Sequence, residues 1–222
     1  MIHPTAVVDE TRGPVSVGDG AVLGPRVVVY GPAIIGDGAH LHAGVIVGDS
    51  AEHLNAETDW EEPVLIGDRV VLRENVVVQR PTQGGMTVIE RGCYVMHGCH
   101  IAHDCRVEED CRLSPKVVLG GHSVVMRQAN LGIAASLHQW AVVGPFAMVG
   151  MGAVVVHDVP PGVTVVGVPA RSIGVNRRGL ENPDEVLDPA GRPQSYSGQM
   201  RDWYDAWLSE RTGALQIVRG RS

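Results

Sequence analysis

The chain has 222 residues, a formal net charge of −7 at pH 7 and a single phenylalanine. The negative charge argues against nucleic acid as a partner, because nucleic-acid-binding domains are usually basic. We find no signal peptide and no uncharged apolar run long enough to cross a bilayer. We therefore expect a soluble, cytoplasmic protein without membrane insertion.

An aliphatic residue recurs at every sixth position along most of the chain. The first stretch runs from Val17 to Val47, the second from Ile66 to Val78, and the third from Ile89 to Val155 without a miss. In the first and third stretches a small residue or valine follows four places later. A period of six fits neither a helix nor a flat strand, but it is typical of short strands wound into a solenoid.

Three such hexapeptides make one turn of a triangular prism. The aliphatic position fills the interior, the small position fits where the interior narrows, and each backbone pairs with the coils above and below. The pattern predicts an all-β parallel β-helix over residues 1–175, with coils about 4.8 Å apart. We expect the 28 glycines to occupy the corners, where left-handed backbone dihedrals are needed.

Two interruptions, at residues 49–64 and 81–87, break the register and predict loops that leave the prism. The first is acidic and contains Glu52 and His53, and the second contains Gly84 and Gly85. Long loops in an otherwise compact repeat are more often functional than not.

The four cysteines follow the same period of six and have no pair spaced as in a zinc site. All four take the small inward position, at Cys93, Cys99, Cys105 and Cys111. We therefore expect buried thiols, reduced in the cytosol, and no bound metal.

Residues 176–222 are predicted to form a polar linker and one short amphipathic α-helix. The apolar stripe of this helix has the spacing i, i+3, i+4, i+7, i+8, at Met200, Trp203, Tyr204, Trp207 and Leu208. The helix lacks the basic face of a membrane-surface helix, so we expect the stripe to be covered by its own prism or by a neighbouring chain.

Residues eighteen positions apart should lie directly above one another on the prism. This spacing puts Gly121 above His103 and His122 above Asp104, with His138 two coils higher in the next column. Several histidines and a carboxylate at one corner indicate a general base. The Gly121 backbone N–H, about one coil spacing from His103, is suited to hold an oxyanion.

At these residues the chain closely resembles the UDP-N-acetylglucosamine O-acyltransferases of lipid A biosynthesis. The motifs that carry the resemblance are His100-Ile101-Ala102-His103-Asp104-Cys105, Leu119-Gly120-Gly121-His122, Leu137-His138-Gln139-Trp140, Ile66-Gly67-Asp68-Arg69, Gln83-Gly84-Gly85, Asp158-Val159-Pro160-Pro161 and Gly174-Val175-Asn176. They occur in order over about residues 1–180.

The resemblance implies a left-handed parallel β-helix, an exception to the usual right-handed crossover, assembled as a homotrimer with active sites between subunits. It also implies transfer of an acyl group from a thioester on acyl carrier protein to a hydroxyl of a UDP-N-acetylglucosamine-like nucleotide sugar. No bound cofactor or metal is implied.

The resemblance further assigns roles to single residues. His103 would be the general base, Asp104 would support it, and the Gly121 N–H would hold the thioester oxyanion. The residues lining the substrate groove would be His100, His122, His138, Gln139 and Asn176, with His53 in the first loop where the family contacts the sugar. Met151 would close the acyl groove, which favours chains of about ten carbons or fewer because each excluded methylene forfeits about 0.8 kcal/mol. The alternative is that Met151 only packs in a subunit interface.

Three departures from the family leave the donor and acceptor open. The first loop reads Ala51-Glu52-His53-Leu54 where the family has Asn-Gln-Asp-Leu, Glu181-Asn182-Pro183 replaces a basic cluster, and one helix replaces a multi-helix domain. Meanwhile Gly167-Val168-Pro169-Ala170-Arg171 is similar to the closing signature of acetyl-CoA-dependent hexapeptide transferases. An acyl-CoA donor, an acetyltransferase acting on a sugar or another small molecule, and an amine acceptor are therefore alternatives.

Two functions from other classes are further alternatives. Met96-His97-Gly98-Cys99 is similar to γ-type carbonic anhydrases, a trimeric zinc family, but Gly92 stands where that family has a histidine. The second is a non-catalytic trimeric scaffold, which would not explain why His103, Asp104 and Gly121 occur together at one corner.

Overall fold

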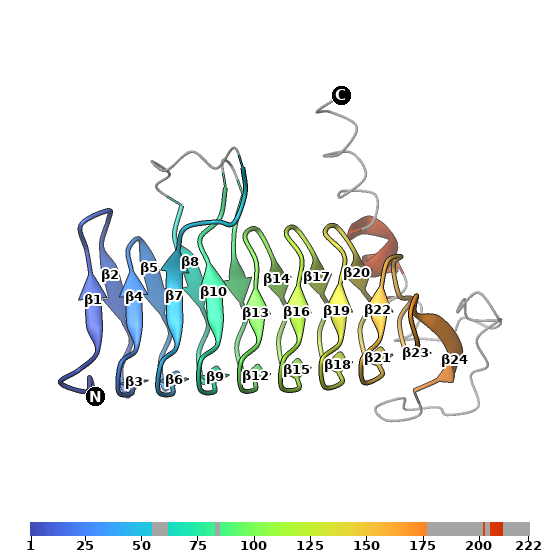
Figure 1. Ribbon diagram of the computed structural model, residues 1–222, viewed down its shortest axis with the longest axis horizontal. Coiled ribbons are helices and arrows are strands. Elements are labelled where there is room, and N and C mark those ends of the chain that lie inside the picture. The colour runs from blue at the N-terminus through green and yellow to red at the C-terminus, as the bar shows by residue number, and fades with distance from the viewer. Residues whose placement is uncertain (55–61, 83–84, 177–201, 203–204, 211–222) are drawn as a thin grey trace.

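The computed structural model describes residues 1–54, 62–82, 85–176, 202 and 205–210. Within these residues the chain is built from short strands that wind into a left-handed β-helix with three faces (Figure 1). All strand pairs are parallel except the last, β23 with β24. The parallel β-helix expected from the hexapeptide period is confirmed, and so is the left hand that the resemblance implies.

Each face is one sheet in which every strand pairs with the next coil. The first face contains β1 (Val7–Asp9), β4 (Val28–Tyr30), β7 (Ile46–Asp49), β10 (Val77–Gln79), β13 (His100–Ile101), β16 (Val118–Leu119), β19 (Ser136–Leu137) and β22 (Val154–Val155). The second contains β2 (Val15–Val17), β5 (Ala33–Ile35), β8 (Val64–Ile66), β11 (Val88–Ile89), β14 (Arg106–Val107), β17 (Val124–Val125) and β20 (Val142–Val143). The third contains β3 (Val22–Leu23), β6 (His40–Leu41), β9 (Val71–Leu72), β12 (Tyr94–Val95), β15 (Arg112–Leu113), β18 (Asn130–Leu131), β21 (Met148–Val149), β23 (Val163–Val166) and β24 (Arg171–Val175).

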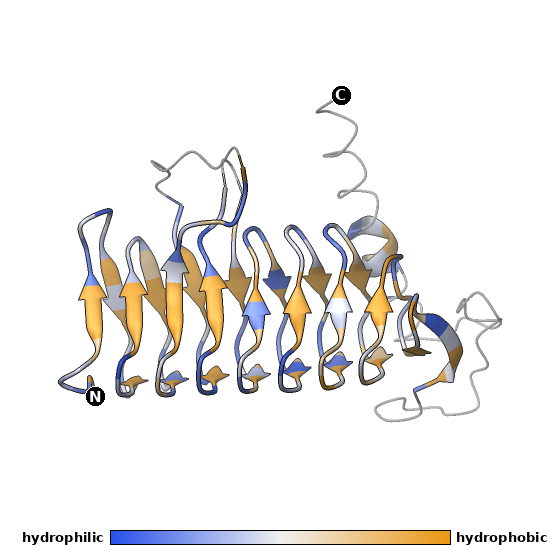
Figure 2. Cartoon of the chain, in the orientation of Figure 1, coloured by the Kyte–Doolittle hydropathy of each residue, from blue (hydrophilic) through white to orange (hydrophobic). Residues whose placement is uncertain are grey.

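The core is a single column of aliphatic side chains inside the prism. The predicted inward positions of the third stretch, Ile89 to Val155, are all at most 4% exposed, and so are those of the second stretch. Val17 is only partly buried, because its strand lies at the end of its sheet. Figure 2 shows mostly apolar strands, with the exception of β13 and β14, joined by more hydrophilic turns.

The four cysteines lie in this core as free, buried thiols. Burial raises the pKa of the Cys99 and Cys105 thiols to about 11. A thiol with so high a pKa is protonated at neutral pH and is a poor nucleophile or metal ligand. The expectation of a buried thiol ladder is confirmed.

The corners differ from our expectation that glycine would occupy them. Every sixth residue from Gly92 to Gly152 has a positive φ, but most of these residues are not glycine. The non-glycine members of this series are Asp104, Asp110, Lys116, His122, Gln128, Ala134, Trp140 and Phe146. A left-handed residue costs roughly 1–2 kcal/mol, and the paired backbone on both sides holds it there. The corners can therefore carry functional side chains.

Three corners join the faces, and we number them by the faces they connect. The first corner, between the first and second faces, contains His103 and Asp104, and the second corner, between the second and third faces, contains Phe146. The third corner, between the third and first faces, contains Met151. The segments between β7 and β8 and between β10 and β11 both leave the prism at the first corner (Figure 1).

Residues 202 and 205–210 are helical and lie against the second face. Trp207 is 4% exposed and packs against Met126 and Val142. Glu210 forms an ion pair with Arg106 at 3.4 Å. The prism itself thus covers this part of the apolar stripe, while Met200, Trp203, Tyr204 and the predicted linker lie outside the described residues.

Of the helical residues that the structure describes, none belongs to a helix long and apolar enough to span a membrane.

Two neighbouring isoleucines on β5 test the inward and outward assignment. Ile35 is 1% exposed and Ile34 is 44% exposed. Ile35→Ala should lower the unfolding free energy by about 2–5 kcal/mol, because it leaves a cavity in a core one side chain wide. The matched change Ile34→Ala should cost less than about 1 kcal/mol. Chemical denaturation of both variants is the measurement, and equal losses would contradict the assignment.

Candidate active site

His103 and Asp104 form a hydrogen-bonded pair at the first corner, between β13 and β14. His103 Nδ1 lies 2.8 Å from Asp104 Oδ2, and the two residues are 8% and 9% exposed. The corner geometry explains the pairing, since Asp104 has a φ of 60° and its side chain turns back to the preceding ring. The pair is therefore nearly buried but keeps a small opening to solvent.

The surroundings of Asp104 keep its carboxyl group ionised. Burial acts to raise the pKa of Asp104, but the hydrogen bonds from His103 and Thr82, together with nearby His122, outweigh it, so the pKa lies below its ordinary value. Asp104 is thus ionised at neutral pH and can only accept hydrogen bonds. Nδ1 of a neutral His103 must then carry the proton, which leaves Nε2 with the lone pair that a general base needs.

Gly121 lies one coil above His103, as the spacing of eighteen predicts. A Cβ added at Gly121 would lie 2.5 Å from Cε1 and 2.6 Å from Nε2 of the His103 ring. Glycine is therefore required here for the close approach of the ring. Among the described residues, no acceptor is found for the Gly121 backbone N–H.

His122 and Trp140 continue the column above Asp104. His122 Nε2 lies 3.5 Å from Asp104 Oδ2, and its ring meets that of His103 edge to face, with centroids 5.1 Å apart. Trp140 stacks flat on His122, with ring centroids 3.9 Å apart and an interplanar angle of 4°. Asp104 is thus shared between two imidazoles, and the indole holds the upper one in place.

The first loop reaches the same corner from below. The His53 ring contacts the His103 ring edge to face at a centroid distance of 5.4 Å. Glu52 Oε2 lies 3.7 Å from His100 Nε2. The resemblance predicts His53 and His100 as groove residues. It gives no such role to Glu52, which the sequence identifies only as part of an acidic loop.

Three polar side chains near the second loop escaped the sequence prediction. The Thr82 hydroxyl donates a hydrogen bond to the Asp104 carboxylate. The Thr87 hydroxyl accepts one from the Asp104 N–H, and the Gln79 side-chain oxygen accepts one from the His103 N–H. The spacing of eighteen hid them, because the insertion changes the spacing between this coil and the next. The strand pairing Val78 with Ile101, twenty-three residues apart, is the signal that would have aligned them.

The remaining predicted residues do not meet the pair within one chain. His138 and Gln139 lie two coils above at the first corner and are exposed. Asn176 lies at the second corner, where its Nδ2 donates to the Phe146 carbonyl at 2.8 Å. Met151 lies at the third corner and is 73% exposed.

Asn176 borders a separate polar hollow of about 640 Å³ on the third face. Its lining includes Arg112 and Asn130, which lie on the outward side of neighbouring strands. The hollow and the His103 pair therefore occupy different parts of the prism in a single chain.

The described residues contain one cluster with metal-ligand side chains, His103, Asp104 and His122. In this cluster His103 Nδ1 and Asp104 Oδ2 are joined directly by a hydrogen bond, and Thr82 also donates to Oδ2. The histidine of the carbonic-anhydrase-like motif, His97, lies exposed at the third corner, away from the cluster. The donor set thus suits proton transfer better than metal binding.

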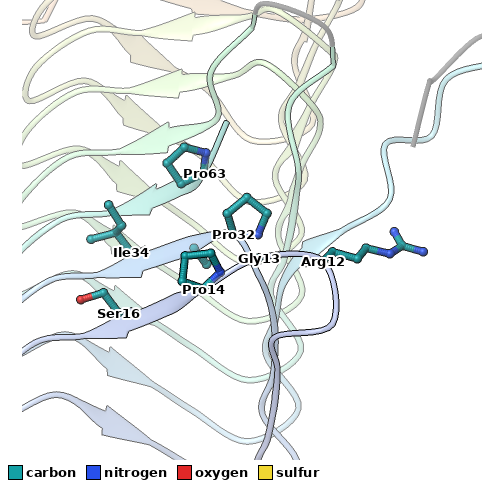
Figure 3. Close-up of a pocket in the computed structure, with 8 residues that line it drawn as sticks. Arg12, Gly13, Pro14, Ser16, Pro32, Ile34 and Pro63 are labelled. Atoms are coloured by element: carbon teal, nitrogen blue, oxygen red, sulfur yellow. The ribbon is translucent and has the colours of Figure 1, made fainter. Parts of the chain in front are cut away.

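A second hollow, of about 480 Å³, lies on the second face near the N-terminus. Figure 3 shows Pro14, Pro32 and Pro63 gathered near Ile34, with the Arg12 side chain extending away from them. Among the described residues that line it, none is a carboxylate, histidine or cysteine. The described lining of this hollow therefore offers no side chain suited to act as a general base.

Comparison with known proteins agrees with the fold. The chain matches the family described as bacterial transferase hexapeptide (six repeats) over residues 14–49 and 86–121. It is similar to the UDP-N-acetylglucosamine acyltransferase of Francisella novicida, with a TM-score of 0.72 and 27% identity over 83% of this chain and 75% of that one. The corresponding enzyme of Bacteroides fragilis gives a TM-score of 0.69 at 25% identity, over 82% of this chain and 76% of that one.

Curated relatives carry the same name. The acyl-(acyl-carrier-protein)–UDP-N-acetylglucosamine O-acyltransferase of Gloeothece citriformis is 34% identical over 70% of this chain, and the chain spans only 56% of that relative. The relative of the same name in Syntrophobacter fumaroxidans is 35% identical over 83% of this chain and 78% of its own length. The chain therefore belongs to the acyl-(acyl-carrier-protein)–UDP-N-acetylglucosamine O-acyltransferase family.

Proposed function

We propose that the protein transfers an acyl group from acyl carrier protein to a hydroxyl of a UDP-N-acetylglucosamine-like nucleotide sugar, as a step of lipid A biosynthesis. The observation that carries this proposal is the hydrogen bond between His103 Nδ1 and the ionised Asp104 carboxylate, 2.8 Å long. This bond leaves His103 Nε2 available to accept a proton. The names of the relatives support the donor and the acceptor. The assay compares this donor with acyl-CoA and this hydroxyl acceptor with an amine.

The proposed reaction uses only groups at this corner. His103 Nε2 removes the proton from the acceptor hydroxyl as its oxygen attacks the thioester carbonyl carbon. The resulting oxyanion is held by the Gly121 N–H, in the manner of oxyanion holes built from backbone donors. When the intermediate collapses, the carbon–sulfur bond breaks and the leaving thiolate takes the proton back from His103.

The walls of the proposed site come from two protomers of a homotrimer. His100, His122, His138, Gln139 and His53 lie on the same corner as His103 and would line the groove from one side. Asn176 and Met151 lie at other corners, so a neighbouring copy must bring them to the reacting atoms. In this arrangement the exposed Met151 side chain would limit the acyl chain to about ten carbons, because excluded methylenes lose burial.

His103→Ala should reduce turnover by about 10²- to 10⁴-fold, the usual cost of losing a general base. The matched control is His97→Ala, since His97 is an exposed histidine at the third corner. Both variants should remain folded, although His103→Ala should melt at a lower temperature because Asp104 loses a buried hydrogen bond. Turnover is measured with acyl carrier protein thioesters and UDP-N-acetylglucosamine, and a His103→Ala variant with wild-type turnover would refute the assignment.

Gly121→Ala should reduce kcat by roughly 10²-fold or more, comparable to the loss of one oxyanion donor. The new methyl would overlap the His103 ring and push it away from Gly121. Gly152→Ala is the control for the general cost of a Gly→Ala change, because a Cβ there meets nothing within 4 Å and only its φ of +64° adds backbone strain. Steady-state kinetics on both variants, with circular dichroism to check folding, makes the comparison. Equal activities in the two variants would contradict the proposal that Gly121 must lack a side chain for His103 to act.

Mixed trimers test whether the site is shared between copies. His103→Ala and Asn176→Ala protomers, each of low activity alone, should regain about a quarter of wild-type activity when co-expressed at equal amounts, because random assortment restores that share of the interfaces. Light scattering should give three chains per particle. A monomer, or the absence of any recovery, would contradict a shared site.

A further inference from the structure

The Asp104 carboxylate is held from the coil below by the segment between β10 and β11. The Thr82 backbone N–H donates to Oδ1 at 3.0 Å, and the Thr82 hydroxyl donates to Oδ2 at 2.6 Å. Oδ2 also receives the hydrogen bond from His103 Nδ1 at 2.8 Å. One threonine thus occupies both oxygens of the carboxylate that supports the proposed base.

The backbone of the pair is held from the same side. The Thr87 hydroxyl oxygen accepts the Asp104 N–H at 2.8 Å, and Gln79 Oε1 accepts the His103 N–H at 3.3 Å. Thr87 and Gln79 are 0% and 2% exposed, so water does not compete for these bonds. Gly85 allows the segment to come this close, because a Cβ at Gly85 would overlap the Asp104 carboxylate.

These contacts matter because the terminal torsion of an aspartate is soft. Rotation about χ2 of Asp104 is broad and two-fold, so the residue alone does not fix where its oxygens point. Two hydrogen bonds from Thr82 stop that rotation with Oδ2 facing His103 Nδ1. A fixed acceptor at Nδ1 fixes both the tautomer and the orientation of the imidazole.

We propose that Thr82 is a positioning residue that locks Asp104 and thereby sets His103 as a base, which makes the second loop part of the catalytic apparatus. Its effect on turnover rests on the proposed function. Its effect on the His103 ring does not, since that follows from the hydrogen bonds alone.

The test compares Thr82→Val, which loses the hydroxyl but keeps the shape and the backbone N–H, with Thr82→Ser, which keeps the hydroxyl. Thr82→Val should lower kcat by about 10- to 100-fold, as expected when a hydrogen bond that orients the partner of a reacting group is removed. KM for both substrates should stay within about twofold, as for a group that acts only on the chemical step. Thr82→Ser should restore kcat to near the wild-type value.

Proton NMR of the full-length protein gives a readout that needs no substrate. The downfield Nδ1 proton of His103, identified by its loss in Asp104→Asn, should be present in the wild type and Thr82→Ser and lost or shifted upfield in Thr82→Val. In the Asp104→Asn background, Thr82→Val should have no further effect on kcat, because both changes act on one interaction.

The proposal is overturned if Thr82→Val keeps the wild-type Nδ1 proton and kcat, or if its cost adds in full to that of Asp104→Asn. If the Nδ1 proton responds as expected but the wild type acylates no nucleotide sugar, the proposed function fails and the positioning role stands. The two failures are thus distinguishable.

Discussion

The whole molecule depends on the parallel hydrogen bonding that ties each strand to the strand one coil away. Because this ladder runs along all three faces, a residue's neighbours above and below are set by the length of one coil. Ile101 pairs with Leu119 and Leu119 with Leu137, each eighteen residues on. The aliphatic interior needs only one residue in six, so the outward positions remain available for chemistry.

The corner conformation links this ladder to the site. The ladder turns at each corner through a residue of positive φ, and at the first corner these residues include Asp104, His122 and Trp140. The strain that the corner requires therefore falls on functional side chains, which project away from the core and stack on one another. A carboxylate, an imidazole and an indole that are far apart in sequence form one column without any dedicated loop.

The period of six was enough to predict the fold class, the buried positions and the stacking of Gly121 over His103. Thr82 and Gln79 could not be found in this way, because the insertion after Arg80 breaks the count that aligns coils. The flat stacking of Trp140 on His122 could not be predicted either, since ring stacking depends on side-chain rotamers. The preference for glycine at corners was wrong because the paired backbone tolerates other residues there.

Both insertions start at the first corner, and their thermodynamic cost is small. Val47 pairs with Val78, thirty-one residues away instead of eighteen, and the parallel pairing continues with a single register shift between Val78 and Gln79. Closing the longer loop costs only about 0.5 kcal/mol more by the logarithmic dependence on length. The segments facing His103 can therefore change in length and composition while the prism stays intact. Substrate preference in this architecture can diverge at the corner without a new fold.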